Sequence, residues 1–287
     1  MDSSTDAADG PGHRHAYGKG LDSRGYIERE GSLGRIPGPF RPVVAVARDR
    51  LLDTFGARLT GAYLYGSVPR GTAGPGQSDL DLLVVLREEP RDADRADARG
   101  LDEALDKEFA QIDGAGTLLV GRAQVLSDLE THDLGWFVAC LCTPLLGEDL
   151  AEFLPRYRPD SLLARETNGD LALFLERWRA RIPETTTEAG LRAFLRGASR
   201  HVVRTGFTLV MPRWNGWTSD LDEMAAVFAA HYPEHGPQLH RAAALGRTPT
   251  GDPAVALPAL RSYVDDLGPW LAEEYARVHG VKAPRPE

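Results

Sequence analysis

The sequence has no long hydrophobic run, and this absence excludes membrane-spanning proteins. No stretch of its 287 residues approaches the ~18 consecutive apolar residues that a transmembrane helix needs. The first 20 residues also lack the apolar core of a secretory signal peptide. We therefore expect a cytoplasmic protein, and its 42% hydrophobic residues are enough to build two domain cores.

Cysteine and net positive charge are also scarce. The only cysteines, Cys140 and Cys142, are two residues apart in a segment expected to be helical, so they cannot easily bridge and are predicted to be core residues. The net charge of −9 and a pI of about 5.4 argue against a general nucleic-acid-binding protein. An acidic surface suits a cationic small substrate, but it also serves solubility, and both interpretations stay open.

The chain divides into three parts by composition and periodicity. Residues 1–36 are rich in Gly, Ser, Asp and Arg without periodicity, and we expect a mobile tail with a short ordered piece around residues 25–30. Residues 37–126 combine helical and strand patterns. The expected strands are 61–67, 78–86 and 117–120, with 123–126 as a possible addition to the third. From residue 127 to 287 the apolar spacing is helical. We predict an α/β (α+β) domain with a mixed sheet, followed by an all-α helical bundle domain.

Asp79 and Asp81 stand at the start of the apolar run LLVVL (residues 82–86). An unpaired buried charge costs several kcal/mol, so a cation is expected beside them. Residues two apart on a strand project from the same face, about 6.5–7 Å apart along the chain. Carboxylate pairs of this kind can hold Mg²⁺ together with water and substrate phosphates. The pair is therefore a candidate metal site.

The pair Gly66-Ser67 ends the preceding strand pattern and leads into a glycine-rich loop. Glycine lets a phosphate approach the backbone closely, and exposed N–H groups with a hydroxyl form an anion site. The sequence thus predicts a phosphate-binding turn a short distance before the carboxylate pair.

The stretch LYGSVPRGTAGPGQSDLDLLVVL (residues 64–86) resembles the signature of the DNA polymerase β-like nucleotidyltransferase superfamily. This resemblance implies that Gly66 and Ser67 hold the nucleotide phosphates. It also implies that Asp79 and Asp81 coordinate Mg²⁺, with two ions expected. ATP is the expected co-substrate.

Over the whole chain the layout is similar to that of the aminoglycoside nucleotidyltransferases of the streptomycin/spectinomycin type. In that family a nucleotidyltransferase domain precedes a helical bundle, and the ligands lie between them. The resemblance aligns Arg200 with an arginine that reaches the phosphates, and we assign Arg70 and Arg204 to nucleotide binding with it. If residues 191–209 form one helix, its arginines share one side, which a plain solvated face would also explain.

The sequence departs from the family at two positions. The family's third carboxylate belongs on the strand AGTLLV, where this chain has Gly116 and Thr117. The candidate replacement is Asp113, which has the strand parity of Thr117, although it may belong to the preceding turn instead. The position of the family's phosphate-binding lysine corresponds to Trp217-Thr218-Ser219, where no lysine aligns.

The resemblance implies transfer of a nucleoside monophosphate to a hydroxyl of a small acceptor of aminoglycoside type, with release of pyrophosphate. Trp178 could stack near an acceptor sugar, or it could be core; Glu184 could hold a cationic acceptor, or it could be a solvated loop residue. Two other functions stay open. One is an enzyme of this fold that modifies a protein or tRNA, and the other is a catalytically degenerate nucleotide-binding regulator.

Overall fold

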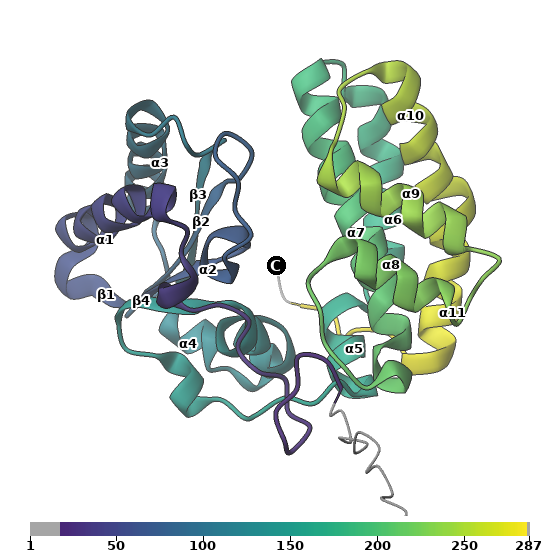
Figure 1. The fold of residues 1–287 in the computed structure, drawn as a ribbon, viewed down its shortest axis with the longest axis horizontal. Helices are drawn as coiled ribbons and strands as arrows, with labels where there is room; N and C mark the ends of the chain where they lie inside the picture. The colour runs from purple at the N-terminus through teal and green to yellow at the C-terminus, as the bar shows by residue number, and fades with distance from the viewer. Residues whose placement is uncertain (1–17, 286–287) are drawn as a thin grey trace, which may run out of the picture.

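The structure, a computed structural model, describes residues 18–285. Within this range four strands form one mixed sheet in the order β3-β2-β1-β4 (Figure 1). The strands are β1 (Leu59–Tyr65), β2 (Leu80–Leu86), β3 (Ala115–Gly121) and β4 (Thr143–Gly147). Strand β1 is antiparallel to β2 and β4, whereas β2 and β3 are parallel. The predicted mixed sheet is confirmed.

Strand β2 is buried on both faces, as its apolar sequence predicts. The helices on one face are α1 (Arg41–Phe55) and α3 (Asp92–Glu108). Leu82 and Val84 pack into the cluster beneath these helices, whereas Leu83 and Val85 belong to a separate cluster on the other face. Because side chains alternate along a strand, Asp81 shares the face of Leu83, away from α1 and α3.

Short helical turns connect the strands and carry the chain out of the sheet. They are η1 (Leu33–Arg35), η2 (Gly38–Phe40), η3 (Gly56–Arg58), α2 (Ser67–Arg70), α4 (Arg122–Val125), η4 (Asp128–Glu130), η5 (Thr131–Gly135), η6 (Phe137–Leu141) and η7 (Leu150–Phe153). The turn α2 follows β1 directly, at the end of the sheet that faces the helical part (Figure 1).

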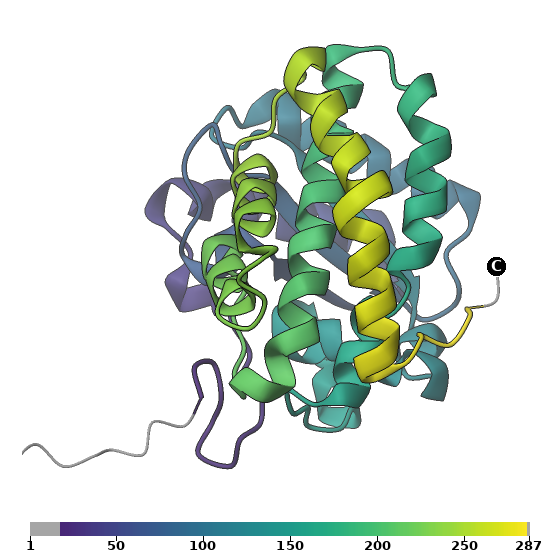
Figure 2. The same cartoon turned by 90° about the vertical axis from the view of Figure 1, so that its right-hand side faces the viewer.

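The rest of the described chain is helical, as predicted. Its elements are α5 (Ser161–Asn168), α6 (Leu171–Arg181), η8 (Ile182–Glu184), α7 (Glu188–Trp214), α8 (Leu221–Ala229), α9 (Gly236–Arg247), α10 (Pro253–Ser262), η9 (Tyr263–Leu267) and α11 (Gly268–His279). Leu195, Val202 and Leu209 of the long α7 are fully buried. Figure 2 shows this part from its outer side, with the yellow α10 and α11 running across it. None of the helices within residues 18–285 combines the length and apolarity that a bilayer crossing requires.

Two local predictions after residue 120 are wrong. Residues 122–125 form the short helix α4 rather than an addition to the third strand. Residues 143–147, expected to be helical, form β4, which pairs with β1 at the edge of the sheet. An edge strand is specified by its partner as much as by its own residues, so periodicity does not detect it. Cys140 and Cys142 are free and buried, which confirms them as core residues.

The described part of the predicted tail is packed rather than mobile. Leu21 and Ile27 are buried in the core cluster of the helical part, whereas Ile36 is buried in the cluster beneath α1 and α3. Leu21 and Ile27 also form an isolated antiparallel bridge, which agrees with the short ordered piece expected near residues 25–30. A few separated apolar residues produce this packing, so the sequence shows no periodicity there. Residues 1–17 lie outside the described residues.

Candidate functional site

A glycine turn at the end of β1 approaches the aspartate pair at the start of β2. Gly66 has φ 78° and ψ −150°, a backbone conformation that favours glycine. A Cβ atom at this position would lie 2.3 Å from Oδ2 of Asp81, so no side chain fits there. Ser67 follows as the first residue of α2 and is half-buried. The fold therefore brings the predicted phosphate-binding turn against the predicted metal-binding pair.

The Asp81 carboxylate lies in an environment that disfavours its charge. Burial and, after it, the neighbouring Asp79 carboxylate raise the pKa of Asp81 from 3.8 to about 6, against the opposing charge of Arg196. Within residues 18–285 no group donates a hydrogen bond to the Asp81 carboxylate. Asp79, by contrast, forms an ion pair with Nη2 of Arg196 at 2.8 Å. A cation shared between the two carboxylates would relieve both the burial cost and their mutual repulsion.

The arginine side of α7 faces these carboxylates. Arg196, Arg200 and Arg204 follow one another at a spacing of four residues, and the charges of Arg196 and Arg200 both act on Asp81. Arg200 is half-buried, and its Nε donates a hydrogen bond to the Gly246 carbonyl at 2.9 Å. Burial, together with the neighbouring charges of Arg196 and Arg204, lowers the pKa of Arg200 to about 10. Arginines crowded together in this way favour binding of a polyanionic ligand. Because Arg200 is half-buried, the alternative of a purely solvated arginine face does not describe it.

Arg70 of α2 belongs to the same group of charges. Arg204 is exposed to solvent, yet the protein around it lowers its pKa, and the charge of Arg70 adds to the decrease. Nη1 of Arg70 lies 3.5 Å from the carboxylate of Glu30. The structure thus gathers the predicted nucleotide-binding arginines from two distant parts of the chain around the aspartate pair.

The face of β3 beside Asp81 offers no third carboxylate. The register pairs Asp81 with Gly116. Asp113 lies in the turn before β3 with its side chain exposed. Thr117, whose strand parity Asp113 shares, donates its hydroxyl to Asp102 of α3 at 2.6 Å and therefore points to the opposite face. The β3 register does not extend to Asp113, whose N–H donates to the Ser78 carbonyl at 3.0 Å, next to Asp79, so the role of Asp113 stays a prediction.

The two predicted acceptor-binding residues lie in different environments. Trp178 of α6 is only 8% exposed, and its ring packs edge-on against His201 and beside Phe174. This is the core alternative considered for Trp178, and a buried ring cannot stack on a sugar. Glu184, at the end of η8, is exposed to solvent, and its role in acceptor binding stays a prediction.

The sequence reasoning did not identify two residues of this region. Tyr65, half-buried on β1, is the cross-strand partner of Asp81. Glu30 accepts a hydrogen bond from Nε1 of Trp217 at 2.8 Å and contacts Arg70. The position of Tyr65 beside the Gly66 turn could have indicated it. Glu30, a single carboxylate in a polar segment, could not have been identified from the sequence in this way.

The residues present fit a divalent cation that is shared with a phosphate ligand. Within residues 18–285 no group of three His, Cys, Asp or Glu side chains could enclose a metal on its own. Mg²⁺ commonly binds one or two carboxylates and completes its shell with water and substrate phosphates. Asp79 and Asp81 supply such a pair, and among the described residues the Asp81 carboxylate has no competing hydrogen-bond donor.

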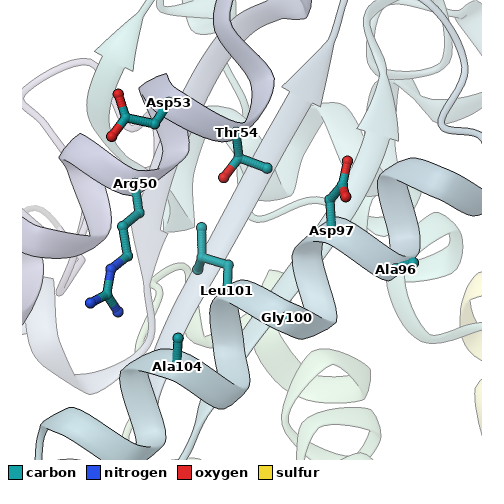
Figure 3. Close-up of a pocket in the computed structure, with 8 residues that line it drawn as sticks. All are labelled: Arg50, Asp53, Thr54, Ala96, Asp97, Gly100, Leu101 and Ala104. Atoms are coloured by element: carbon teal, nitrogen blue, oxygen red, sulfur yellow. The ribbon is translucent and has the colours of Figure 1, made fainter.

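A separate groove lies between α1 and α3 (Figure 3). Its lining residues are Arg50, Asp53, Thr54, Ala96, Asp97, Gly100, Leu101 and Ala104. Because α1 and α3 cover the sheet face opposite Asp81, this groove is distinct from the candidate site. It shares no residue with the Gly66 turn or the arginine side of α7.

Comparisons with known proteins identify one domain. Residues 46–114 match the family model of the nucleotidyltransferase domain, a range that includes Gly66, Ser67, Asp79 and Asp81. The predicted nucleotidyltransferase motif is confirmed. Among solved structures, spectinomycin adenyltransferase from Enterococcus faecialis, crystallised with ATP and spectinomycin, is similar at 13% sequence identity and a TM-score of 0.49. That match covers 81% of this chain and 98% of the other. No curated protein matches the sequence.

Proposed function

We propose that this chain, whose residues 46–114 match a nucleotidyltransferase domain, is a Mg²⁺-dependent enzyme that transfers AMP from ATP to a hydroxyl group of a small acceptor. The observation that supports this most directly is the close approach of the Gly66 turn to Asp81, opposite the arginines of α7. In the reaction, the acceptor oxygen bonds to the α-phosphorus and the bond from that phosphorus to pyrophosphate breaks. The hydroxyl proton leaves to solvent or to a base.

The chain's own residues would bind and orient the triphosphate. Gly66 leaves room for a phosphate to approach the backbone, and the Ser67 hydroxyl can donate a hydrogen bond to it. Arg196, Arg200 and Arg204 would neutralise its charge from the opposite side. Positioning and charge neutralisation supply most of the catalysis in phosphoryl transfer, which asks little covalent chemistry of the protein.

Asp79 and Asp81 would hold the divalent ions. When bound, Mg²⁺ supplies positive charge to the phosphate oxygens and helps to orient them. In the structure Asp79 forms an ion pair with Arg196, and the Arg196 charge also acts on Asp81. Binding of nucleotide would therefore give Arg196 a phosphate partner in place of Asp79.

The acceptor is proposed to be a small cationic molecule with hydroxyl groups, of the aminoglycoside class. A net charge of −9 favours a cationic partner, and the exposed Glu184 could contribute to holding it. Trp178 is left out of this proposal because its ring is buried.

The test is transfer of label from α-³²P-ATP, with Mg²⁺, into a panel of aminocyclitols and aminoglycosides. Asp81→Asn should lower turnover at least ~100-fold, because it removes a charge that holds the ion beside the reacting phosphate. Asp49→Asn, at an exposed position on α1, is the matched control and should retain full activity. Asp113→Asn tests the predicted third carboxylate, and full activity of this variant would exclude that role. An Asp81→Asn enzyme with more than about a tenth of wild-type turnover would contradict the metal role.

A second candidate function is a nucleotide-binding regulator without transfer activity. The observation that favours it is Gly116, which stands where the face of β3 beside Asp81 would carry a third carboxylate. Binding of ATP without pyrophosphate release would support this alternative. Label found on protein or RNA would instead identify a macromolecular acceptor.

A further inference from the structure

Glu30 lies in the segment that joins the helical part to the sheet, and its backbone is firmly held. Its N–H donates to the Cys140 carbonyl at 2.9 Å, and its own carbonyl accepts from Nη1 of Arg35 at 2.9 Å. The N–H of Ser32 donates to the Pro69 carbonyl at 3.0 Å. These bonds fix the segment against α2, the turn that follows Gly66.

Gly31 is the residue that allows this close approach. A Cβ atom at Gly31 would lie 2.4 Å from Oγ1 of Thr143 and 2.9 Å from Cβ of Pro69. Contacts below 3.0 Å essentially never occur for a real Cβ, so any side chain would push the segment away from α2. Glycine at this position therefore places the Glu30 side chain beside the nucleotide turn.

The Glu30 carboxylate joins two distant elements. One oxygen accepts a hydrogen bond from Nε1 of Trp217 at 2.8 Å, and the other lies 3.5 Å from Nη1 of Arg70. The Glu30 side chain is only 14% exposed, compared with 32% for Arg70. Trp217 is itself buried and packs edge-on against Trp136 and Phe207, so it gives the carboxylate a rigid anchor.

The charge of Glu30 also acts on the arginines of the site. Arg70 and Arg204 repel each other, and Glu30 is a nearby carboxylate that offsets this repulsion. Unlike Asp79 and Asp81, it belongs to a separate segment of the chain, and its carboxylate contacts Arg70 and Trp217. It can therefore stabilise the cations without competing for the metal ions.

We propose that Glu30 is a positioning residue that holds Arg70, and with it the cationic side of the site, toward the triphosphate. This inference rests on the proposed function, because that function places the nucleotide phosphates at the Gly66 turn. Glu30 acts through Arg70 and does not itself contact the nucleotide. Trp217 fixes the carboxylate, so the helical part of the molecule contributes to the geometry of the phosphate turn.

The experiment measures the dissociation constant of ATP with Mg²⁺ by titration calorimetry, for the full chain and four variants. Glu30→Gln keeps the acceptor for Trp217 but removes the charge beside Arg70, and it should weaken ATP binding about tenfold, as loss of an orienting partner commonly does. Glu28→Gln, an exposed glutamate of the same segment, should leave binding unchanged. The other two variants are Arg70→Ala and the double variant Glu30→Gln/Arg70→Ala.

The double-mutant cycle separates a positioning role from a purely structural one. If Glu30 acts through Arg70, Glu30→Gln should cost less than about twofold in the Arg70→Ala background. Equal losses in both backgrounds, or no loss in the Glu30→Gln protein, would overturn the inference. Failure of the wild-type protein to bind ATP would overturn the proposed function itself, and the Glu30 inference with it.

A second variant covers the case in which Glu30→Gln does not fold. Trp217→Phe keeps an aromatic ring for the contacts with Trp136 and Phe207 but removes the N–H that anchors Glu30. It should weaken ATP binding several-fold when measured well below its thermal midpoint, which the smaller ring is expected to lower. Unchanged ATP affinity in this variant would contradict the positioning role.

Discussion

At the scale of single residues, the site depends on a carboxylate held in an unfavourable place. Asp81 is largely surrounded by protein, lies against the Gly66 turn and is repelled by the neighbouring Asp79 carboxylate. Active sites commonly sacrifice stability in this way, because the groups that bind ligand are not satisfied by the protein alone. The raised pKa of Asp81 means that ionisation of this carboxylate destabilises the folded protein, and this effect can be measured.

Asp81→Asn should stabilise the protein at neutral pH in the absence of ligand. The pKa of Asp81 is raised from 3.8 to about 6 in the fold, so its contribution to stability is fully present below pH 3.8 and is lost as the pH rises through about 6. Removal of the charge should therefore raise the thermal midpoint by a few degrees at pH 7.5, with little change at pH 4. Thermal denaturation of both proteins across this pH range is the measurement. A midpoint that falls equally at both pH values would contradict the assigned environment.

At the scale of elements, α7 has an apolar side that packs in the core and an arginine side that faces the candidate site. Its apolar residues, among them Leu195 and Val202, are buried in the core of the helical part. Its arginines recur every four residues on another side, and Arg196 reaches Asp79 of the sheet-bearing part. The helix thus builds the core and supplies cations to the site.

Arg196→Ala should raise the KM for ATP about tenfold, because hydrogen bonds to charged groups are worth roughly 1.5–3 kcal/mol. Arg192→Ala is the matched control: Arg192 lies one helical turn earlier and is exposed, with no ion pair among the described residues. Its KM should be unchanged. Steady-state kinetics with varied ATP make the comparison, and equal effects of the two changes would show that only the general charge of the helix matters.

At the scale of the whole molecule, the segment from residue 18 to residue 40 ties the two parts together. Ile27 is buried in the core of the helical part, and its N–H donates to the Tyr157 carbonyl at 2.8 Å. Ile36 and Phe40 are buried beneath α1 and α3. The segment has almost no regular structure, yet its apolar side chains complete both cores.

Ile27→Ala should destabilise the protein by about 2–4 kcal/mol, the usual loss for truncating a buried aliphatic side chain. Ile27 is 5% exposed, whereas Leu33 of the same segment is 46% exposed, so Leu33→Ala should change stability little. The urea midpoints of the two variants provide the comparison. Similar midpoints for both would show that the segment does not contribute to the cores.

The sequence alone determined the local features of this protein. The spacing of two residues put Asp79 and Asp81 together at the start of β2, the Gly66-Ser67 pair marked the predicted phosphate turn, and helical spacing aligned the arginines of α7. These features depend on neighbours two to four residues apart, which is the range over which strand and helix periods act. The nucleotidyltransferase motif could be recognised for the same reason, since it lies within one strand-turn-strand unit.

Only the tertiary structure decided which distant residues meet. The Arg196–Asp79 ion pair joins residues 117 positions apart, and Glu30 reaches Trp217 across 187 positions. The register of β3 against β2 placed Gly116 beside Asp81, and the pairing of β4 with β1 overrode a helical pattern. Such contacts depend on how whole elements pack, because a side chain's long-range partner is set by the register and docking of both elements and not by its own sequence neighbours.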